Sequence, residues 1–352
     1  MSHLLIRADA SRNIGSGHLM RCLALAQEWK STGCNATFLS YTESDSLREQ
    51  IEAAGINFLA LEKPHPHPAD LQTMSSLLRG QSFSHVALDG YNFDPIYQEA
   101  IQASGCRTLV IDDYAHQPAY RTDILLNQNL GANTLTYHCN PETVLLLGPT
   151  YALLRPEFMM WRGWHREIPA VARKILITMG GSDPDNVTLK VMQALQQVDI
   201  DGLEALVIVG ANNPHYQQVE AGARCLPDKV NTDRLSIKLV RNPASMPELM
   251  AWADLAVSGG GSTCWEMAFM GLPSILLILA DNQRIVAAES DKARTAINLG
   301  RFEQVTPTKL GNSLTELCHD RDRRLSLCRN GRRLIDGDGC RRLTTIMAEP
   351  EQ

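Results

Sequence analysis

Short apolar runs alternate with amphipathic stretches through the first 150 residues of the chain. The runs that suit buried strands are 4–8, 36–39, 58–61, 85–88 and 108–111, and the helix-like patterns are 18–32, 44–54 and 94–104. Strands that alternate with helices are typical of a mostly parallel sheet with helices on both faces. We therefore predict a Rossmann-like, doubly wound α/β domain over residues 1–150.

The alternation stops at residues 151–172, where prolines bracket a segment that contains Trp161 and Trp164. It resumes with strand-like runs at 174–179, 205–209, 236–240, 255–258 and 274–279. Residues 173–335 are thus expected to form a second Rossmann-like domain, with 151–172 as the linker. Because ligands of such sheets bind beyond the carboxyl ends of the strands, we expect the substrate in a cleft between the two domains.

Three more helix-like stretches follow, at 307–318, 320–330 and 339–347. They are separated by Gly331 and by the glycine-containing residues 336–339. The last stretch belongs to an expected C-terminal helix within 336–352, which could pack on either domain.

Composition excludes several classes of function. The 352 residues are 44% hydrophobic with a formal net charge of -6, which argues against a nucleic-acid binder. The arginine-rich stretches 321–324 and 332–333 are then interpreted as a solvated helix face. Since no run of about 18 apolar residues occurs and residues 1–4 lack the features of a secretory signal, we expect no stable insertion into a membrane.

The nine cysteines are spread singly, without a Cys-x-x-Cys pair. This spacing predicts reduced, mostly buried thiols in a cytoplasmic protein rather than disulfides or a zinc site. The adjacent Asp112 and Asp113 point in different directions, so they predict turn roles rather than a metal site. We expect neither a metal nor a cofactor, and the sequence leaves the oligomeric state open.

His18 follows Gly15 and Gly17 and opens a helix-like run. The positive end of the helix dipole disfavours a protonated imidazole, so His18 is expected to be a neutral acceptor near pH 7. A catalytic base and a histidine that only caps the helix fit this pattern equally well. Tyr91, in the run Asp89-Gly90-Tyr91 that ends another strand, is a candidate for positioning a substrate.

Glycine-bearing turns follow two strands of the second half, at Gly180-Gly181 and at 259–261. Glycines before the helix that starts near Ser262 and Thr263 expose backbone N–H groups that suit a diphosphate. Glu266 fits a capping box with Thr263 and is also placed to accept ribose hydroxyls; the pattern by itself favours the cap.

Asn282 and Gln283 directly follow a buried strand, at the point where a loop reaches the expected cleft. Amide side chains suit sugar hydroxyls and acetamido groups, because they pair with them without burying a charge. A helix N-cap is the alternative interpretation of Asn282. The chain has no P-loop, and the glycines at 15 and 17 lack the third glycine of a nicotinamide-binding loop.

These motifs occur together in the order found in a known family. They are 7–26 with Gly15, Gly17 and His18; Asp89-x-Tyr91; Asp112-Asp113; 148–158 with Arg155; Gly180-Gly181-Ser182-Asp183; Ser258-x-Gly260 with Trp265-Glu266; 280–283; and Asp336-Gly337-x-Gly339. The set resembles the UDP-sugar hydrolases of pseudaminic acid biosynthesis, which cleave UDP from UDP-2,4-diacetamido-2,4,6-trideoxy-β-L-altropyranose. The resemblance spans nearly the whole chain and implies the glycosyltransferase-B architecture, in which the second half holds UDP.

The resemblance also implies roles for individual residues. His18 would activate water against the anomeric carbon with inversion, and Tyr91 would assist it. Glu266 would bind the ribose of the UDP-sugar substrate. The further residues expected to bind UDP or the sugar are Gly15, Gly17, Arg155, Gly181, Gly260, Gly261, Ser262, Thr263, Asn282 and Gln283. An inverting UDP-sugar glycosyltransferase and a nucleotide-sugar binding protein without turnover are the alternatives.

Overall fold

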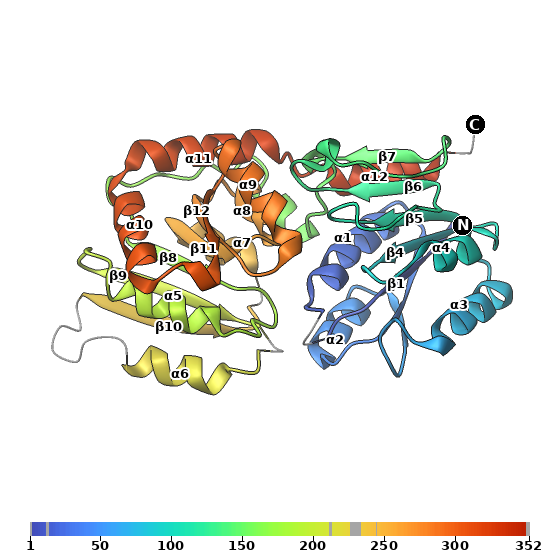
Figure 1. Cartoon of the computed structure of the whole chain (residues 1–352), viewed down its shortest axis with the longest axis horizontal. Coiled ribbons are helices and arrows are strands. Elements are labelled where there is room, and N and C mark those ends of the chain that lie inside the picture. Colours follow the sequence, from blue (N-terminus) through green and yellow to red (C-terminus); the bar gives the residue numbers. More distant parts are fainter. Residues whose placement is uncertain (1, 12–13, 211–212, 226–233, 244, 350–352) are drawn as a thin grey trace. The chain divides into compact units, whose positions relative to one another are not determined.

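The computed structural model describes residues 2–11, 14–210, 213–225, 234–243 and 245–349. The chain forms two compact units (Figure 1): Met1–Pro156 with Gly337–Gln352, and Glu157–Asp336. Each unit holds one parallel sheet with helices between its strands. The predicted class, two Rossmann-like α/β domains, is confirmed.

The sheet of the first unit has seven strands in the order β3-β2-β1-β4-β5-β6-β7, all parallel to their neighbours. The strands are β1 His3–Ala8, β2 Asn35–Ser40, β3 Asn57–Ala60, β4 His85–Asp89, β5 Arg107–Ile111, β6 Ile124–Asn127 and β7 Val144–Leu147. The helices are α1 Gly17–Ser31, α2 Asp45–Ala53, α3 Pro68–Gly80 and α4 Pro95–Gln102. The strand order reverses between β1 and β4, so the loops after these two strands diverge at the place where ligands bind such sheets.

Strands β1, β2, β4 and β5 are buried on both faces, as their continuous apolar runs predict, whereas the edge strands β3 and β7 are partly exposed. Leu4 and Ile6 of β1 lie in a cluster with α1, whereas Leu5 lies in a cluster with Met74 of α3 and Tyr97 of α4. The alternation follows from the two-residue period of a strand. Helices therefore cover both faces of the sheet.

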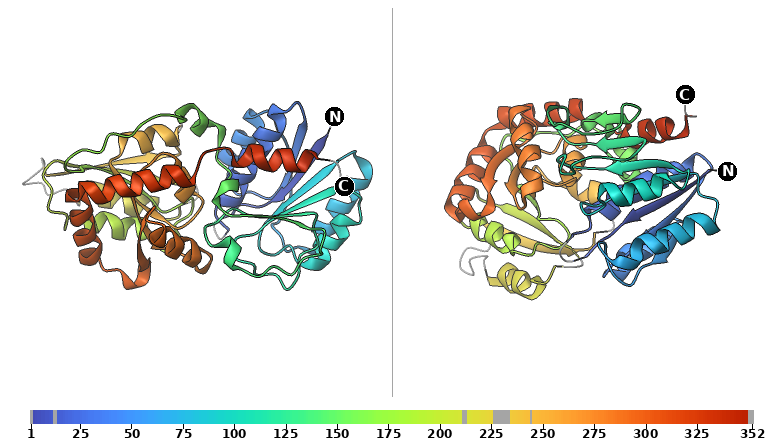
Figure 2. Two further views of the ribbon diagram at one scale, coloured as in Figure 1. Left: turned by 90° about the horizontal axis from the view of Figure 1, so that it is seen from above. Right: turned by 45° about the vertical axis from the view of Figure 1, so that its right-hand side comes forward.

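Helix α12, Gly339–Ala348, packs beside α1 in the first unit (Figure 2). Leu343 and Met347 join the cluster that holds Leu4 and Ile6. The Met347 carbonyl accepts hydrogen bonds from the side chains of His85, at 2.7 Å, and Arg107, at 3.0 Å. The C-terminal helix thus packs on the first unit, which the sequence left open.

The sheet of the second unit has six parallel strands in the order β10-β9-β8-β11-β12-β13. The strands are β8 Lys174–Thr178, β9 Leu203–Val209, β10 Leu235–Arg241, β11 Leu255–Gly259, β12 Ser274–Ile278 and β13 Ile297–Arg301. The helices are α5 Val187–Leu195, α6 Tyr216–Cys225, α7 Met246–Trp252, α8 Thr263–Phe269, α9 Arg284–Lys292, α10 Pro307–His319 and α11 Arg321–Leu334. Here the order reverses between β8 and β11.

Every strand predicted from the sequence is present, but β6, β7, β13 and α3 were not predicted. Strand β13 shows why: only Ile297 is buried, Gly300 has a φ of +93°, and the pairing with β12 shifts register. Strand β7 likewise exposes Val144 and Leu145. Short strands without a fully buried run give little apolar periodicity.

The interpretation of the α11 arginines as a solvated face was wrong for part of the helix. Arg324 is fully buried, and its Nη2 donates to the carbonyls of Pro169 and Ala170 at 3.0 and 2.9 Å. Arg321 donates to the Ile168 carbonyl at 3.0 Å, and Arg332 donates to the Trp164 carbonyl. These side chains satisfy backbone carbonyls of an irregular segment that has no sheet partners.

Gly331 was predicted to separate two helices, but it lies inside α11. A Cβ at this position would be 3.0 Å from the carbonyl oxygen of Ala268 in α8. The glycine therefore allows the two helices to approach closely rather than ending one of them.

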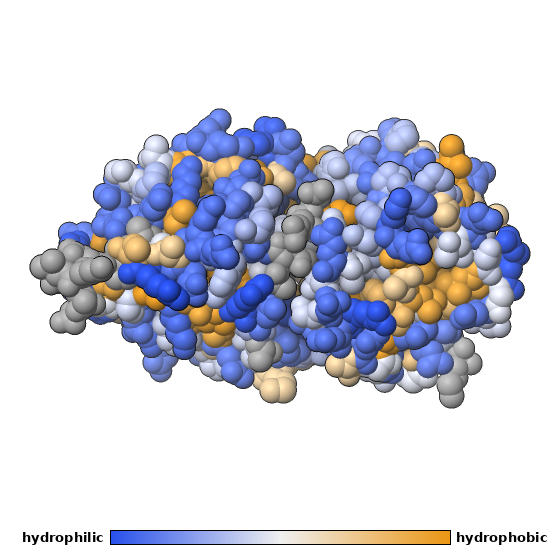
Figure 3. Space-filling view, turned by 90° about the horizontal axis from the view of Figure 1, so that it is seen from below, coloured by the Kyte–Doolittle hydropathy of each residue, from blue (hydrophilic) through white to orange (hydrophobic). Residues whose placement is uncertain are grey.

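In the described parts of the chain, no helix combines the length and apolar character needed to cross a bilayer. Figure 3 shows hydrophilic residues over much of the face that it displays, with apolar areas between them.

Two helical glycines provide a matched test of close packing. In α10, a Cβ on Gly311 would lie 2.5 Å from Gln197 Cβ and 2.9 Å from the Ala194 oxygen, whereas Gly80 in α3 has open space. We expect Gly311→Ala to lower the free energy of unfolding by about 1–3 kcal/mol through overpacking. Gly80→Ala should leave it unchanged or raise it by up to about 1 kcal/mol. Urea unfolding followed by circular dichroism measures both, and equal effects would contradict this packing.

Candidate active site

A fully buried carboxylate, Asp89 at the end of β4, lies at the centre of a polar network. His18 Nδ1 is 2.6 Å from Asp89 Oδ1, and Arg21 approaches both oxygens of Asp89 at 2.6 Å. The Cys22 thiol lies 3.3 Å from Oδ2. His18, Arg21 and Cys22 lie on one face of α1, because residues three and four apart are neighbours on a helix.

The contact with Asp89 defines which ring nitrogen of His18 carries a proton. A carboxylate accepts only, so Nδ1 donates and the neutral ring keeps its lone pair on Nε2. Among the described residues, no group hydrogen-bonds to Nε2. The N-cap of α1 is Ser16, so His18 does not cap the helix. The ring is therefore oriented as a base, with a carboxylate that can stabilise the imidazolium formed when Nε2 takes a proton.

Arg21 links Asp89 to a second carboxylate. Its Nη1 donates to Asp113 Oδ1 at 2.7 Å, and both partners are buried or nearly so. Burial by itself raises the pKa of Asp89, but the charge of Arg21 and the hydrogen bonds from Arg21 and His18 hold that pKa well below its usual range. Burial also opposes ionisation of Asp113, and Arg21 again lowers its pKa. Both carboxylates are ionised at neutral pH.

Tyr91 lies directly against His18. The two ring centroids are 4.9 Å apart with the planes at 80°, and the Tyr91 hydroxyl donates to Asp113 Oδ2 at 2.8 Å. Asp113 also accepts from Asn129 Nδ2 at 2.8 Å. The structure thus brings together the two residues that the sequence singled out as catalytic candidates.

The prediction of turn roles holds for Asp112 and not for Asp113. Asp112 Oδ1 accepts from the backbone N–H groups of Tyr114 and Ala115 at 2.8 and 2.6 Å, which closes the turn after β5. Asp113 binds side chains instead, those of Arg21, Tyr91 and Asn129. Because the two carboxylates point in different directions, one builds the loop and the other belongs to the network.

Sequence reasoning missed the parts played by Asp89, Arg21 and Asp113 around His18. One signal was present: the spacing His18-x-x-Arg21-Cys22 places two polar side chains and a thiol on one helix face, and helices next to a sheet normally bury that face. A charged residue there needs a buried partner at a strand end.

Other predicted residues of the first unit shape the loop before α1. Gly15 has a φ of +79°, and its N–H donates to the Ser11 carbonyl at 2.8 Å, so it makes a left-handed turn that side chains disfavour. Gly17 is the first residue of α1. Arg155 is half-buried near the end of the first unit.

In the second unit, the glycines after β11 differ in their surroundings. A Cβ on Gly259 would lie 2.7 Å from Leu279 Cδ1, and one on Gly260 would lie 3.1 Å from Gln283 Cβ. Gly261 has open space around the same position. Gln283 Oε1 accepts from the N–H groups of Gly260 and Leu279, both at 3.0 Å. Gln283 Oε1 therefore holds the loop after β11. From the sequence, this side chain was expected to bind a sugar.

Helix α8 begins at Thr263, with Ser262 as an N-cap whose side chain makes no capping hydrogen bond. The capping box that the sequence favoured needs Thr263 as the N-cap, so that interpretation was wrong. Glu266 is half-buried in the first turns of α8. Asn282 lies in the short helix η4, Asp281–Gln283, after β12. Gly181 lies in the loop after β8, and its carbonyl oxygen is so close to Gly210, after β9, that a Cβ on Gly210 would clash with it. The candidates of this unit thus lie in the loops after β8, β11 and β12 and in the first turns of α8.

Comparison with known proteins defines the class of the fold. Residues 175–332 match the model of the glycosyltransferase family 28 C-terminal domain. The structure of MurG from Acinetobacter baumannii aligns with a TM-score of 0.68 at 16% identity, covering 99% of each chain. A structure titled LpCGTa in complex with UDP aligns with a TM-score of 0.62 at 14% identity, over 99% of this chain and 98% of that one. The protein has a glycosyltransferase-B-like fold.

Within this class, the resemblance to the UDP-sugar hydrolases is confirmed at modest identity. The UDP-2,4-diacetamido-2,4,6-trideoxy-beta-L-altropyranose hydrolase of Campylobacter jejuni is 25% identical over 63% of this chain and 74% of its own length. The spore coat polysaccharide biosynthesis protein SpsG of Bacillus subtilis is 27% identical over 99% of this chain and 98% of its own. The chain is thus similar over part of its length to a named UDP-sugar hydrolase and over nearly all of it to a polysaccharide biosynthesis protein.

The Asp89 network makes a testable contribution to stability. Asp89→Asn leaves Arg21 with one carboxylate, so we expect a loss of about 3–5 kcal/mol in the free energy of unfolding at pH 7. Because the pKa of Asp89 is depressed in the folded state, its stabilisation is present above the unfolded pKa near 4 and is lost as the pH falls towards the folded pKa.

Urea unfolding at pH 7 and at about pH 3 measures this dependence, with Asp201→Asn as an exposed control. The difference between the wild type and Asp89→Asn should shrink at the lower pH. A difference that is the same at both pH values would contradict the ionised, buried state of Asp89.

Proposed function

We propose that the protein is a hydrolase that cleaves UDP from a UDP-linked 2,4-diacetamido-2,4,6-trideoxy sugar, in the biosynthesis of a nonulosonic acid such as pseudaminic acid. The observation that carries the proposal is the His18–Asp89 pair, at 2.6 Å, with Nε2 of His18 left to act on water. The Campylobacter jejuni relative named as this hydrolase, and a Helicobacter pylori relative named as both a pseudaminic acid cytidylyltransferase and this hydrolase, support the choice of substrate.

In the proposed reaction, His18 Nε2 takes a proton from water while the water oxygen attacks the anomeric carbon. The bond from that carbon to the diphosphate oxygen breaks, and UDP leaves with the electron pair, so the configuration inverts. Asp89 holds the imidazolium until it releases its proton to solvent. Tyr91, packed on the edge of the His18 ring, helps to place the sugar. A diphosphate is a good leaving group, so no strong general acid is required.

The second unit is proposed to bind UDP. The backbone N–H groups near Gly261, Ser262 and Thr263 would face the diphosphate, and Glu266 would bind the ribose. Gly181, Gly260, Asn282 and Gln283 would shape or line the UDP pocket of this unit. For Gly15, Gly17 and Arg155 of the first unit, binding of UDP or the sugar stays a prediction. The open space at Gly261 supports this assignment, because the neighbouring Gly259 and Gly260 are instead closely packed.

An inverting UDP-sugar glycosyltransferase is the second candidate. The match of residues 175–332 to a glycosyltransferase domain favours it, because the same fold serves transfer and hydrolysis. The two differ in what accepts the sugar. Release of UDP that depends on an added acceptor would establish the transferase and contradict the hydrolase.

The first test measures UDP and free sugar from a panel of UDP-sugars by NMR. We expect turnover of the diacetamido substrate without an acceptor, and a fall of about 10²–10⁴-fold in kcat for His18→Ala, since the general base is lost. UDP binding, measured by calorimetry, should persist in the variant. The exposed His138 provides the control His138→Ala. Full activity of His18→Ala would contradict the assigned base.

The second test concerns the glycine loop. Gly261→Ala adds a methyl group where the protein has open space, so stability should not change. If the diphosphate lies there, the affinity for UDP should fall about 10-fold or more, equivalent to about 1.4 kcal/mol. Gly80→Ala is the matched control, because it also adds a methyl group to open space. Unchanged UDP affinity in Gly261→Ala would place the diphosphate elsewhere.

A further inference from the structure

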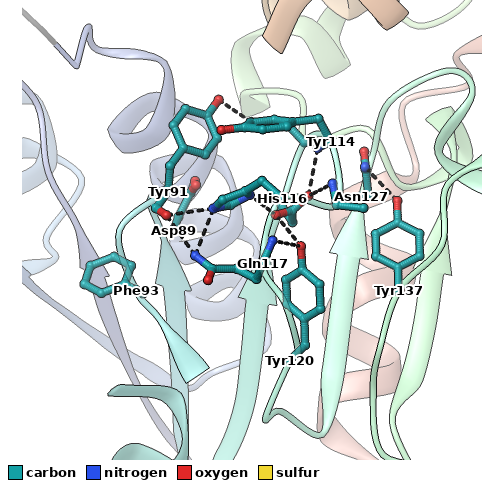
Figure 4. Close-up of polar contacts among 12 residues, drawn as sticks. Asp89, Tyr91, Phe93, Tyr114, His116, Gln117, Tyr120, Asn127 and Tyr137 are labelled. Atoms are coloured by element: carbon teal, nitrogen blue, oxygen red, sulfur yellow. Dashed lines mark hydrogen bonds and ion pairs between the residues drawn. The ribbon is translucent and has the colours of Figure 1, made fainter. Parts of the chain in front are cut away.

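A second histidine, His116, contacts the main chain of Tyr91 from the loop after β5 (Figure 4). Its Nε2 lies 2.7 Å from the Tyr91 carbonyl oxygen, and its Nδ1 lies 2.7 Å from Asp112 Oδ2. Nε2 donates to the carbonyl, whereas Nδ1 contacts Asp112 as an ion pair without an aligned hydrogen bond. The imidazolium is the form that can donate from Nε2 and also present a positive charge to Asp112.

Asp112 gives this histidine a rigid anchor. The Asp112 side chain is 1% exposed. Its Oδ1 accepts from two backbone N–H groups of the turn, and its Oδ2 accepts from the Tyr120 hydroxyl at 2.8 Å. A carboxylate held on both oxygens cannot follow a moving partner, so the position of His116 is defined by the end of β5.

Tyr91 is therefore held at both ends. Its carbonyl receives His116 Nε2 and also Gln117 Nε2, at 2.9 Å. Its ring lies 4.9 Å from the His18 ring, and its hydroxyl binds Asp113. A displacement of the carbonyl would move the ring relative to His18.

We propose that His116 is a positioning residue of this site: as an imidazolium it bridges Asp112 to the main chain of Tyr91 and so holds the Tyr91 ring against His18. The inference rests on the proposed function in so far as Tyr91 assists His18. When the ring loses its charge, the Asp112 carboxylate 2.7 Å from Nδ1 keeps the remaining proton on Nδ1. Nε2 then accepts from Gln117 Nε2, 2.9 Å away, and faces the Tyr91 oxygen as a second acceptor. The carbonyl must move away from it.

The charges around His116 set the direction of the pH dependence. Burial lowers the pKa of His116, but the hydrogen bonds to Asp112 and the Tyr91 carbonyl and the charges of Asp112 and Asp113 outweigh burial and raise it above its ordinary value of 6.5. The other groups that face the ring are Tyr91, Tyr114, stacked at 4.7 Å, and Gln117. The bridge is thus present at lower pH and is lost as the pH rises through the raised pKa.

Kinetics test whether His116 acts through Tyr91. We expect His116→Gln to lower kcat about 10- to 100-fold, the cost of a misplaced group near the reacting atoms, with little change in KM. In the wild type, kcat should fall as the pH rises through the raised pKa of His116, and this fall should be absent in His116→Gln. In a Tyr91→Ala background, His116→Gln should cause no further loss. His138→Gln is the matched control, and an additive loss in the double variant would overturn the inference.

A measurement on the wild-type protein keeps the test independent of activity and of variant folding. With ¹⁵N-histidine and ¹³C-tyrosine labels, the His116 and Tyr91 signals, assigned by His116→Gln and Tyr91→Phe, should move with one shared midpoint above 6.5. A His116 midpoint at or below 6.5, or a Tyr91 signal that does not follow it, overturns the bridge. A shared midpoint in a protein that cleaves no UDP-sugar supports the bridge and contradicts the proposed function.

Discussion

One buried negative charge, that of Asp89, organises the candidate active site. An ionised carboxylate with no exposure to water is tolerated only where paired donors surround it. His18, Arg21 and Cys22 supply those donors from one face of α1. Arg21 extends the network to Asp113. The same contacts that make Asp89 tolerable therefore fix the position and the tautomer of His18.

The parallel sheet explains why these residues meet. In a doubly wound sheet, all strands end at the same edge, and the strand order reverses between β1 and β4. Asp89 ends β4, Asp113 follows β5, and His18 lies in the helix that follows β1. Local turn chemistry then separates the neighbours Asp112 and Asp113, so that one closes a turn and the other binds Arg21. A rigid scaffold thus places flexible side chains within hydrogen-bonding distance.

A comparison within the first unit shows how a histidine is left able to react. Buried Arg7 also lies between two carboxylates, Asp9 and Asp70, and His65 joins that cluster. There, however, His65 uses Nδ1 on Asp70 and Nε2 on the Asn92 carbonyl. His18 uses only Nδ1 on a carboxylate. Similar charge networks therefore serve structure in one place and provide a base in the other.

The sequence by itself determined the two α/β domains, the strands with a continuous buried run other than β6, and His18 and Tyr91 as candidates, because apolar periodicity and local motifs depend on neighbouring residues. It did not reveal β13, the buried Arg324, the unit on which α12 packs, or the Asp89 network. These depend on partners far apart in the chain, such as His18 and Asp89, 71 positions apart. Only the tertiary structure decides which charges meet, since burial makes an unpaired charge costly and a paired one stable.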